Sequence, residues 1–444
     1  MFKSAFPGYA KSYPHKSAYR VIDPAITLSK VWENELQDSL PLYLHIPFGE
    51  SRCGSCDQFT VAQPEQKLIQ QYLQAVERQA QAIRSELPAA RFTQLAIDGG
   101  TPTFLSVQDW QQIFQTLHGT LGIDTRSALF SCEASPGTVD VEKLELLREM
   151  GVDRLSLEVQ SFRESETETM GRPQDPETAI KAIQAVQAAG FPILNINLTY
   201  GAKDQSTGDW LQSVDQATHF QPEEIHLYPF YDYHTGCADQ ASDKLTDRVQ
   251  WDEQRLDAYR AAKDFLAASG YEQVSLRMFR KAQAGAGTAP ASLNLSSTGF
   301  SEQSDGLIGL GCGADSYTRE FHYSYEQFSK STSTVLDDYS QKTVEEFRHA
   351  HFGHSLELDD QKRRHVMKEL LQVNGLDTLA YEVRYGSYVM DDLPQLLELV
   401  LAGYMHWDDT LLQLTPTGLE MSDAIGPWLC SEKVNQLMNA SQCG

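Results

Sequence analysis

Between residues 40 and 280 the chain repeats one pattern, in which a short apolar run precedes a longer segment with apolar residues at helical spacing. The segment 65–87 shows the helical half of this pattern, because its apolar residues recur at the intervals of an amphipathic helix. Ser106 is placed to cap a helix over 106–121, and Gly190 is placed to end a helix over 176–190. The chain is therefore predicted to alternate strands and helices.

The alternation occurs six times, with strands predicted over 40–48, 92–100, 128–134, 153–161, 193–201 and 223–230, and helices over 65–87, 106–121, 140–151, 176–190, 207–220 and 246–269. Parallel strands need crossover helices, so this order predicts a parallel sheet. The handedness of such crossovers makes the run curl into a barrel or an arc. Because six units are fewer than the eight of a closed barrel, we expect an α/β fold with a partial (β/α)6 TIM-like barrel. An open doubly wound sheet is the alternative.

The pattern changes after a strand-like stretch at 271–279. Residues 281–306 are rich in Ala, Gly and Ser, as loops are, whereas 307–318 is a glycine-punctuated apolar stretch that should return to the core. From about residue 337, beginning with QKTVEEFRHAHF, the chain is predicted to be helical, and 404–429 suggests a hairpin followed by a helix. We predict an N-terminal extension (1–39), the partial barrel (40–280), a linker with the glycine-rich segment (281–336) and a smaller, mainly helical C-terminal domain with a winged-helix-like end (337–444).

Composition and charge narrow the class of protein. The chain has 444 residues, of which 41% are hydrophobic and 22% charged, as in an ordinary soluble globular protein. Seven cysteines, few and odd in number, indicate reduced thiols and a cytoplasmic location. No segment has the apolar length of a signal peptide core or a membrane span. The formal net charge of −25 disfavours nucleic acid and anionic membranes as partners, and the short basic run 363–365 is most simply a solvated helix face.

Polar residues and glycines stand where the predicted strands end. Cys53 and Cys56 follow the first strand, Asp98, Gly99, Gly100 and Thr101 end the second, and Glu133, Gln160, Asn197 and Tyr228 lie late in the next four. Ligands of parallel α/β proteins bind outside the carboxyl ends of the strands, so we expect these residues to converge on one site. Taken singly, each has a structural explanation, since glycines end strands and polar residues cap helices and turns.

The motifs LYLHIPF…C..C, DGGTPTFL, EASP, DRLSLEVQSF, GRPQ, NINLTYG and GLGCGADSY occur in this order. Together they resemble the radical S-adenosylmethionine (SAM) proteins related to oxygen-independent coproporphyrinogen III oxidase, over about residues 40–429. The segment SYPHKSAYR (12–20) is similar to a poorly characterised bacterial branch of that group.

The resemblance implies a partial barrel with a small C-terminal domain, SAM as a cofactor, and a [4Fe–4S] cluster held by three cysteines spaced C-x3-C-x2-C. Cys53 and Cys56 match two of these cluster ligands. By motif match, the residues at SAM-contact positions are Tyr43, Gly99, Gly100, Thr101, Glu133, Gln160, Arg172 and Asn197. The two glycines are expected to let the backbone approach SAM, because no Cβ intervenes. The resemblance gives no catalytic side chain.

The chain departs from the family pattern at several of these positions. Gly49 stands where the first cluster cysteine is expected, and Asn197 stands where an aspartate is expected to contact SAM. Further departures are Asp98 and Glu158 in place of glycines, and Cys312 and Asp315 in place of Ala and His. Several changes at contact positions indicate relaxed constraint or a changed task.

The missing ligand leaves several alternatives open. Oxygen ligands from Glu50, Asp57 or Asp98 could substitute for the thiolate, although carboxylate is a harder partner for this cluster. Cys132 and Cys312 are candidate thiols, but the favoured interpretation of both is a small buried side chain. A zinc site at Cys53 and Cys56 would need two distant ligands, and no second pair has suitable spacing.

Three functions are compatible with these observations. The first is a radical SAM enzyme of the coproporphyrinogen-oxidase-like group, which takes electrons from a donor, forms a 5′-deoxyadenosyl radical and acts on a tetrapyrrole or another large organic molecule. The second is a non-catalytic SAM- or haem-binding descendant with a chaperone-like role. The third is a radical SAM methyltransferase. The first and third need a reducible cluster, whereas the second does not.

Overall fold

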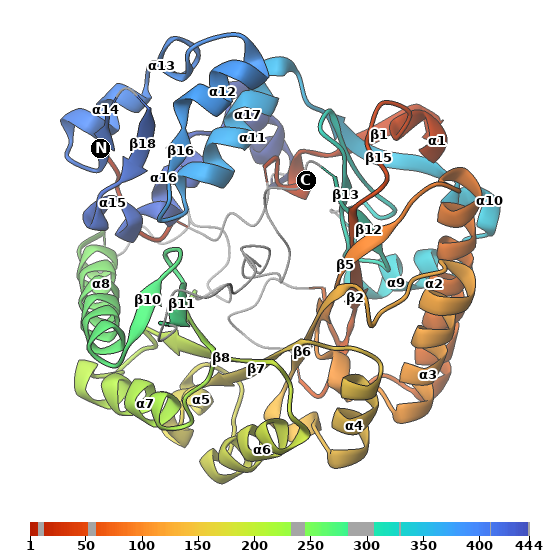
Figure 1. The fold of residues 1–444 in the computed structure, drawn as a ribbon, viewed down its shortest axis with the longest axis horizontal. Helices are drawn as coiled ribbons and strands as arrows, with labels where there is room; N and C mark the ends of the chain where they lie inside the picture. The colour runs from red at the N-terminus through yellow and green to blue at the C-terminus, as the bar shows by residue number, and fades with distance from the viewer. Residues whose placement is uncertain are drawn as a thin grey trace.

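The partial barrel predicted from the alternation is present. The computed structural model describes residues 1–7, 13–51, 59–231, 245–282, 306–327, 330–408 and 410–442. Its largest sheet has nine strands in the order β10-β11-β9-β8-β7-β6-β5-β2-β12, which curve into an open arc (Figure 1). The six predicted strands are β2 (Leu40–Ile46), β5 (Phe92–Gly99), β6 (Leu129–Ala134), β7 (Arg154–Gln160), β8 (Ile193–Tyr200) and β9 (Glu224–Pro229). Every neighbouring pair among them is parallel, which confirms the predicted fold class.

The crossover helices lie on the outer side of this arc (Figure 1). They are α2 (Gln66–Glu86), α3 (Val107–Gln115), α4 (Val141–Glu149), α6 (Pro176–Ala189), α7 (Thr207–His219) and α8 (Leu245–Ala268), with the short α5 (Glu164–Thr169) between β7 and α6. Ser106 caps α3 through a capping box with Asp109, and Gly190 ends α6 in the left-handed conformation with φ of 72°. Both helix boundaries are therefore where the sequence predicts them.

The side chains of the parallel strands divide cleanly between the two faces of the sheet. Alternate apolar residues, such as Leu42 and Leu44 of β2 or Leu155 and Leu157 of β7, belong to one core with the helices. The residues between them face the inside of the arc, and on β2, β5, β6, β7, β8 and β9 these are mostly polar. The hollow of the barrel is therefore lined by groups that can bind a polar ligand.

The two edges of the large sheet refine the sequence prediction. β12 (Ile308–Leu310) pairs in parallel with β2, so the glycine-punctuated stretch returns to the core and adds a further parallel strand. The stretch 271–279 does not form one strand. It is divided between two antiparallel strands, β10 (Tyr271–Gln273) and β11 (Met278–Lys281). Antiparallel neighbours can be joined by a short turn, so no helix lies between them. β11 in turn pairs antiparallel with β9.

A second sheet joins distant parts of the chain. Its four strands are β1 (Arg20–Thr27), β15 (His349–Ser355), β14 (Phe321–Ser324) and β13 (Ser316–Tyr317). The prediction of a helix through HAHF is wrong, because these residues start β15, which pairs with β1 and β14. Helices in this region are limited to α9 (Thr332–Gln341) and α10 (Val344–Phe347). The proposed domain limits stay a prediction, and this sheet joins strands from three of the four proposed segments.

The remaining short elements flank these sheets. Before the barrel lie η1 (Lys16–Ala18) and α1 (Leu28–Val31), and after β2 lie the two-residue strands β3 (Phe48–Gly49) and β4 (Val61–Ala62). Three further single turns follow barrel elements, η2 (Pro102–Phe104), η3 (Thr116–Thr120) and η4 (Pro136–Thr138).

The C-terminal region has its own apolar core, separate from that of the barrel. Its elements are α11 (Leu358–Leu370), β16 (Leu376–Asp377), α12 (Thr378–Tyr385), α13 (Val389–Asp392), α14 (Leu396–Leu401), β17 (Met405–Trp407), β18 (Leu411–Leu414), α15 (Pro416–Glu420), α16 (Ser422–Trp428) and α17 (Glu432–Gln442). The β17–β18 hairpin followed by helices matches the predicted winged-helix-like end.

The basic run 363–365 on α11 is not a solvated face as predicted. The side chain of Arg364 is 6% exposed and donates a hydrogen bond to the carbonyl oxygen of Thr318, 3.0 Å away. The error arises because a long cationic side chain can lie along a neighbouring element while its charge is satisfied there.

The C-terminal region contacts both sides of the open arc. Arg277, directly before β11, binds both carboxylate oxygens of Asp423 on α16 at 2.7 Å. On the other side, Arg364 of α11 reaches the carbonyl of Thr318, next to β13. The region therefore bridges the gap between the β10–β11 edge and the β12 edge (Figure 1).

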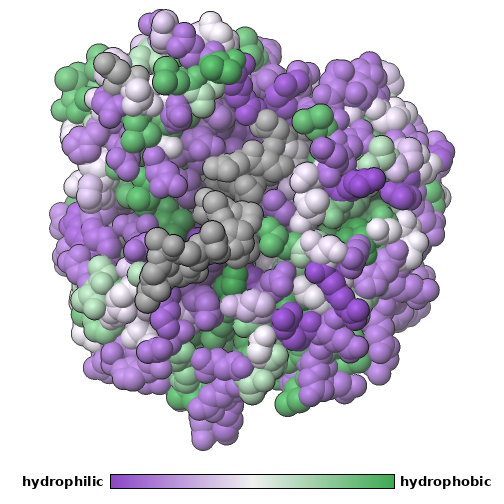
Figure 2. Space-filling model, in the orientation of Figure 1, coloured by the Kyte–Doolittle hydropathy of each residue, from purple (hydrophilic) through white to green (hydrophobic). Residues whose placement is uncertain are grey.

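Polar and charged residues cover most of one face of the molecule. Figure 2 shows them over most of the face in view, with apolar residues in small, separate groups. None of the described helices combines the length and the apolar composition that a bilayer crossing requires.

Candidate functional site

The carboxyl ends of the parallel strands form one rim of the barrel, and the end of β2 is its first part. Tyr43 and His45 both face the inside of the arc, and His45 Nδ1 lies 3.1 Å from the Tyr43 hydroxyl. His45 Nε2 lies 2.9 Å from the carbonyl oxygen of Phe59, directly after the segment that carries the predicted cluster cysteines. His45 is 3% exposed and uses both ring nitrogens. It therefore acts as a structural link that positions Tyr43 and the end of this loop.

The glycines at the end of β5 are required by packing within the protein. A Cβ on Gly99, whose φ is 128°, would lie 2.6 Å from the carbonyl oxygen of Ile46, and a Cβ on Gly100 would lie 2.6 Å from that of Phe48. The Gly100 and Thr101 amides donate to these same two carbonyls, at 2.8 and 2.7 Å. Their missing Cβ atoms therefore make room for the protein's own backbone, and the expected approach of SAM to these glycines stays a prediction.

Gly49 lies beside Thr101 at this rim. It belongs to β3, which pairs in parallel with β4 and closes the base of the loop between them. The backbone of Gly49 is not in the left-handed region, and its φ suits any residue. A Cβ there would lie 3.3 Å from the Thr101 hydroxyl oxygen, which is tight but needs a shift of only a few tenths of an ångström. The position accepts a side chain, and that side chain would point toward Thr101.

Glu133 on β6 presents a carboxylate oxygen without a partner. Its Oε2 is buried, and no other described atom hydrogen-bonds to it. An ionised oxygen in this state is destabilised by about 1–3 kcal/mol or more. A ligand that donates an ammonium or hydroxyl group to Oε2 would remove this penalty.

Glu158, Asn197 and Arg172 meet at the ends of β7 and β8. Glu158 and Asn197 are paired in register, and the Asn197 amide nitrogen donates to Glu158 Oε1. Asn195 in turn donates to Asn197 Oδ1 at 2.6 Å. Burial raises the pKa of the Glu158 carboxyl, while the positive charge of Arg172 and the Asn197 amide lower it. Glu158 thus places a carboxyl group directly beside Asn197 on the neighbouring strand.

Gln160 ends β7 in a strained conformation. Its φ of 62° lies in the left-handed region, and the pairing with β8 shifts between Glu158 and Gln160. A bulge with a non-glycine residue at positive φ is uncommon and marks functional sites more often than ordinary strand ends. The side chain is 6% exposed, so the bulge places it within the rim.

The raised pKa of Glu158 gives a prediction for stability against pH. Because the folded protein favours the protonated carboxyl, the stabilising contribution of Glu158 is present at low pH and lost as pH rises through the raised pKa. Glu158→Gln stays uncharged and can keep the bond from Asn197. We expect its melting temperature, relative to the wild type, to rise as pH increases above about 4.5. Thermal melts across this range measure the difference.

The matched control for this prediction is Glu164→Gln, the same substitution at an exposed position at the start of α5. Its difference from the wild type should not follow the same trend. A difference between Glu158→Gln and the wild type that is constant with pH would show that burial does not act on this carboxyl.

Inside the barrel, below this rim, lies a network of charged residues that the sequence analysis did not single out. Arg154 of β7 binds Glu224 of β9 at 2.7 Å, and Arg280 of β11 binds the same carboxylate at 3.0 Å. Above this network, burial and the charges of nearby arginines lower the pKa of His226 well below its usual value. Its Nε2 is buried with no partner among the described atoms. The sequence did contain a signal for these inward-facing charges, because polar and apolar residues alternate in RLSLE (154–158) and EIHLY (224–228).

The predicted site residues therefore form two groups on one rim. Tyr43, Gly99, Gly100 and Thr101 lie together where β2 and β5 end, and Gln160, Arg172 and Asn197 lie around the ends of β7 and β8. Glu133 stands on β6 between them. Cys53 and Cys56 lie outside the described residues.

Among the residues that the structure describes, the other thiol and carboxyl donors do not complete a cluster site, and Asp57 lies outside them. Cys132 and Cys312 are 2% and 0% exposed and belong to the apolar core on the outer face of the sheet, and burial raises the pKa of both thiols well above their usual value. Asp98 accepts a bond from the amide of Gly99. Within the described ranges, no three His, Cys, Asp or Glu side chains are grouped to hold a metal ion. The described donors thus do not fit a cluster with three protein thiolates.

The fold and the rim define a class of protein. Residues 43–216 match the Radical SAM superfamily, so the chain carries a radical SAM domain. Within that class it is a homologue of oxygen-independent coproporphyrinogen III oxidase. The protein of that name from Escherichia coli (strain K12) is 28% identical over 387 residues, which cover 85% of this chain and 82% of the relative.

Two further comparisons agree with this assignment. The solved structure of coproporphyrinogen III oxidase (HemN) from Escherichia coli matches with a TM-score of 0.76 at 22% identity, covering 95% of this chain and 97% of that one, so the whole fold is shared. The heme chaperone HemW from Haemophilus influenzae is 26% identical over 247 residues, which cover 55% of this chain and 63% of the relative. The predicted resemblance is confirmed.

Proposed function

We propose that this protein binds SAM at the carboxyl-end rim of its barrel and is a radical SAM enzyme acting on a porphyrin-like or other large organic molecule. The observation that carries the proposal is the buried Glu133 Oε2, which has no partner among the described atoms and lies between two groups of polar residues at one rim. SAM offers the ammonium and ribose hydroxyl groups that such an oxygen accepts. The substrate class follows from the relatives, which are named for coproporphyrinogen III or for heme.

The residues of the rim would divide the ligand between them. Glu133 would accept a hydrogen bond from a ribose hydroxyl or an ammonium group. Arg172 would pair with a carboxylate, and Glu158, held by Asn197, would face a positive group. When bound, an iron–sulfur cluster supplies the electron that cleaves SAM in this class. The cluster position of Gly49 lacks a thiolate, so this chain holds fewer ligands for it than the family pattern has.

Gly49 favours a second candidate function, a non-catalytic protein that binds SAM or haem in the same barrel. A chain that forms no cluster for lack of this ligand has no radical chemistry but keeps the same rim. This alternative shares the ligand site with the first and differs from it in the cluster.

Anaerobic purification followed by reconstitution with iron and sulfide tests both candidates. Isothermal titration with SAM is performed before and after reconstitution, and 5′-deoxyadenosine is measured with a strong reductant present. SAM binding, cluster absorbance and 5′-deoxyadenosine release together support the enzyme. SAM or haem binding without cluster absorbance or 5′-deoxyadenosine supports the second candidate and rules out the first. Absence of SAM binding in every state contradicts the proposed site.

A further inference from the structure

The C-terminal region gathers exposed apolar side chains on its outer helices. Twelve large apolar residues are exposed in the described part of the chain, and six of them lie between residues 379 and 407: Leu379, Val383, Tyr388, Leu397, Leu401 and Trp407. Val383 and Leu401 are the most exposed of these six, at 88% and 80%. Apolar groups are visible over α13 and α14 at the upper left of Figure 2. Single exposed apolar residues are ordinary, whereas several in one part of a surface indicate an interaction site.

The helix α14 is apolar on its exposed side as well as on its buried side. Leu396 and Leu399 are fully buried in the C-terminal core. Leu397 and Leu401 are four residues apart, so they share one face of the helix, and both are exposed. Trp407 of β17, the strand that contacts α14, is half exposed. A helix that is apolar on all sides is normally covered on all sides, so the exposed face of α14 has the composition of a surface that another molecule covers.

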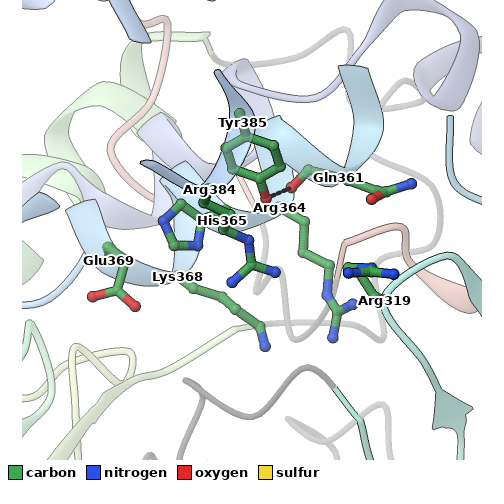
Figure 3. Close-up of a pocket in the computed structure, with 8 residues that line it drawn as sticks. All are labelled: Arg319, Gln361, Arg364, His365, Lys368, Glu369, Arg384 and Tyr385. Atoms are coloured by element: carbon green, nitrogen blue, oxygen red, sulfur yellow. Dashed lines mark hydrogen bonds between the residues drawn. The ribbon is translucent and has the colours of Figure 1, made fainter. Parts of the chain in front are cut away.

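The helix α12 shows the same division between a packed and an exposed face. Its Tyr385 donates a hydrogen bond to the carbonyl oxygen of Gln361 on α11, 3.2 Å away, so this face of α12 packs on α11 (Figure 3). Arg384, the only Lys or Arg of α12, lies 5.3 Å from the centre of the Tyr385 ring. Leu379 and Val383 are four residues apart and lie on one exposed face. Two helices of the same region thus each leave an apolar face uncovered.

Negative charge surrounds these apolar faces. The sequence has no Lys or Arg in residues 385–432, whereas it has eight Asp or Glu residues there. Asp391 and Glu398 are exposed and form no ion pair with any described residue. Asp423, which lies away from these faces, is by contrast paired with Arg277. A partner that carries cations around an apolar surface would complement this charge.

The same charges argue against three other occupants of the exposed faces. Because α14 contains no Lys or Arg, a nucleic acid or an anionic membrane would meet only unfavourable charge there. A second copy of this chain would bring like surfaces together in a two-fold dimer, so Asp391 and Glu398 would face negative charge of the same kind. A basic and apolar protein surface is the occupant that these observations favour.

We propose that the exposed faces of α12 and α14, together with Trp407, bind a partner protein through a segment whose apolar side chains are flanked by Lys or Arg. An amphipathic basic helix has this chemistry. Burial of the apolar side chains supplies the affinity, and the acidic surroundings select a cationic segment against an anionic one. This inference goes beyond the proposed function, because it depends on neither SAM, nor a cluster, nor the substrate.

Fluorescence anisotropy with the purified full-length protein tests the inference. The probe is a labelled peptide of about five helical turns with Leu on one face and Lys on the other, and a second peptide carries Glu in place of Lys. Measurements at about 0.15 M salt screen the general attraction of a negatively charged protein for a cationic peptide.

The variants are Leu397→Ser and Leu401→Ser, made singly and together. Each should weaken binding of the Leu/Lys peptide about tenfold, because each removes one large apolar side chain from the contact. The control is Leu36→Ser, the same change at a residue that is 84% exposed in the N-terminal segment. Melting temperatures establish that every variant is folded.

The outcomes decide between the possible occupants. Binding of the Leu/Lys peptide that is lost in the double variant and kept in Leu36→Ser supports the inference. Absence of binding by the wild type, a change below twofold in the folded double variant, or equal binding of the Leu/Glu peptide overturns it. A wild-type dimer in sedimentation equilibrium that Leu401→Ser dissociates would assign the faces to a second copy and also overturn it. None of these results depends on SAM binding, so a failure here is distinguishable from a failure of the proposed function.

Discussion

Gly49→Cys should raise the iron and acid-labile sulfide content of the reconstituted protein and increase its absorbance near about 400 nm, where thiolate-ligated clusters absorb. The backbone of Gly49 already has a conformation that any residue adopts, and a side chain there would point toward Thr101 at the rim. The loop base is fixed by the β3–β4 pairing and by the bond from Gln63 to the carbonyl of Gly49 at 2.9 Å. The substitution therefore adds a thiolate with little rearrangement.

The expected size of this effect follows from metal-site energetics. A structural zinc site with four ligands contributes about 10–16 kcal/mol; an equal share for one thiolate of a cluster is about 3 kcal/mol, or roughly a hundredfold in affinity. Gly49→Ser adds an oxygen of similar size and should gain far less, because thiolate is the softer ligand. Gly119→Cys adds a thiol at a position where nothing lies within 4 Å and controls for non-specific iron binding. Equal iron in the Cys and Ser variants at position 49 would contradict this explanation.

The barrel could be predicted because its signals are local and repeated. The spacing of apolar residues predicts each strand and each crossover helix, as in α2, and the capping residue Ser106 predicts the start of α3. The rim followed from topology, since parallel strands present their carboxyl ends on one side. Tyr43, Thr101, Glu133 and Asn197 are placed on that side by the same rule.

What the sequence could not give depends on contacts between distant segments. β15 looked helical because its partners, β1 and β14, are remote in the chain. Arg364 looked solvated because the carbonyl of Thr318 that it binds belongs to another sheet. The packing role of Gly99 and Gly100 could not be predicted for the same reason, since the atoms that exclude their Cβ belong to the end of β2 and to β3.

The departures from the family pattern also gain meaning from these contacts. Glu158 and Asn197 appeared as two independent changes, yet they are paired in register and hydrogen-bonded to each other. The two residues therefore form one hydrogen-bonded unit at the rim, and the two departures need not be independent.

Glu133→Gln should weaken SAM binding by about 10- to 100-fold, because a hydrogen bond to a charged acceptor contributes about 1.5–3 kcal/mol. The same substitution should leave the free energy of unfolding of the ligand-free protein unchanged or raise it by up to about 1 kcal/mol, since it removes an unpartnered buried charge. The affinity for SAM should therefore fall while the stability stays the same or rises. This trade-off is typical of binding sites that contain unsatisfied polar groups in the absence of ligand. Isothermal titration and denaturant unfolding measure the two quantities.

The opposite signs make this prediction specific to a ligand-binding role for Glu133. A carboxylate that served the fold would lose stability and affinity together when neutralised. Glu145→Gln, the same substitution on the exposed side of α4, should change neither quantity. If Glu133→Gln changes the SAM affinity less than twofold, Glu133 is not part of the binding site. The reason to place SAM between the ends of β5 and β7 would then be lost.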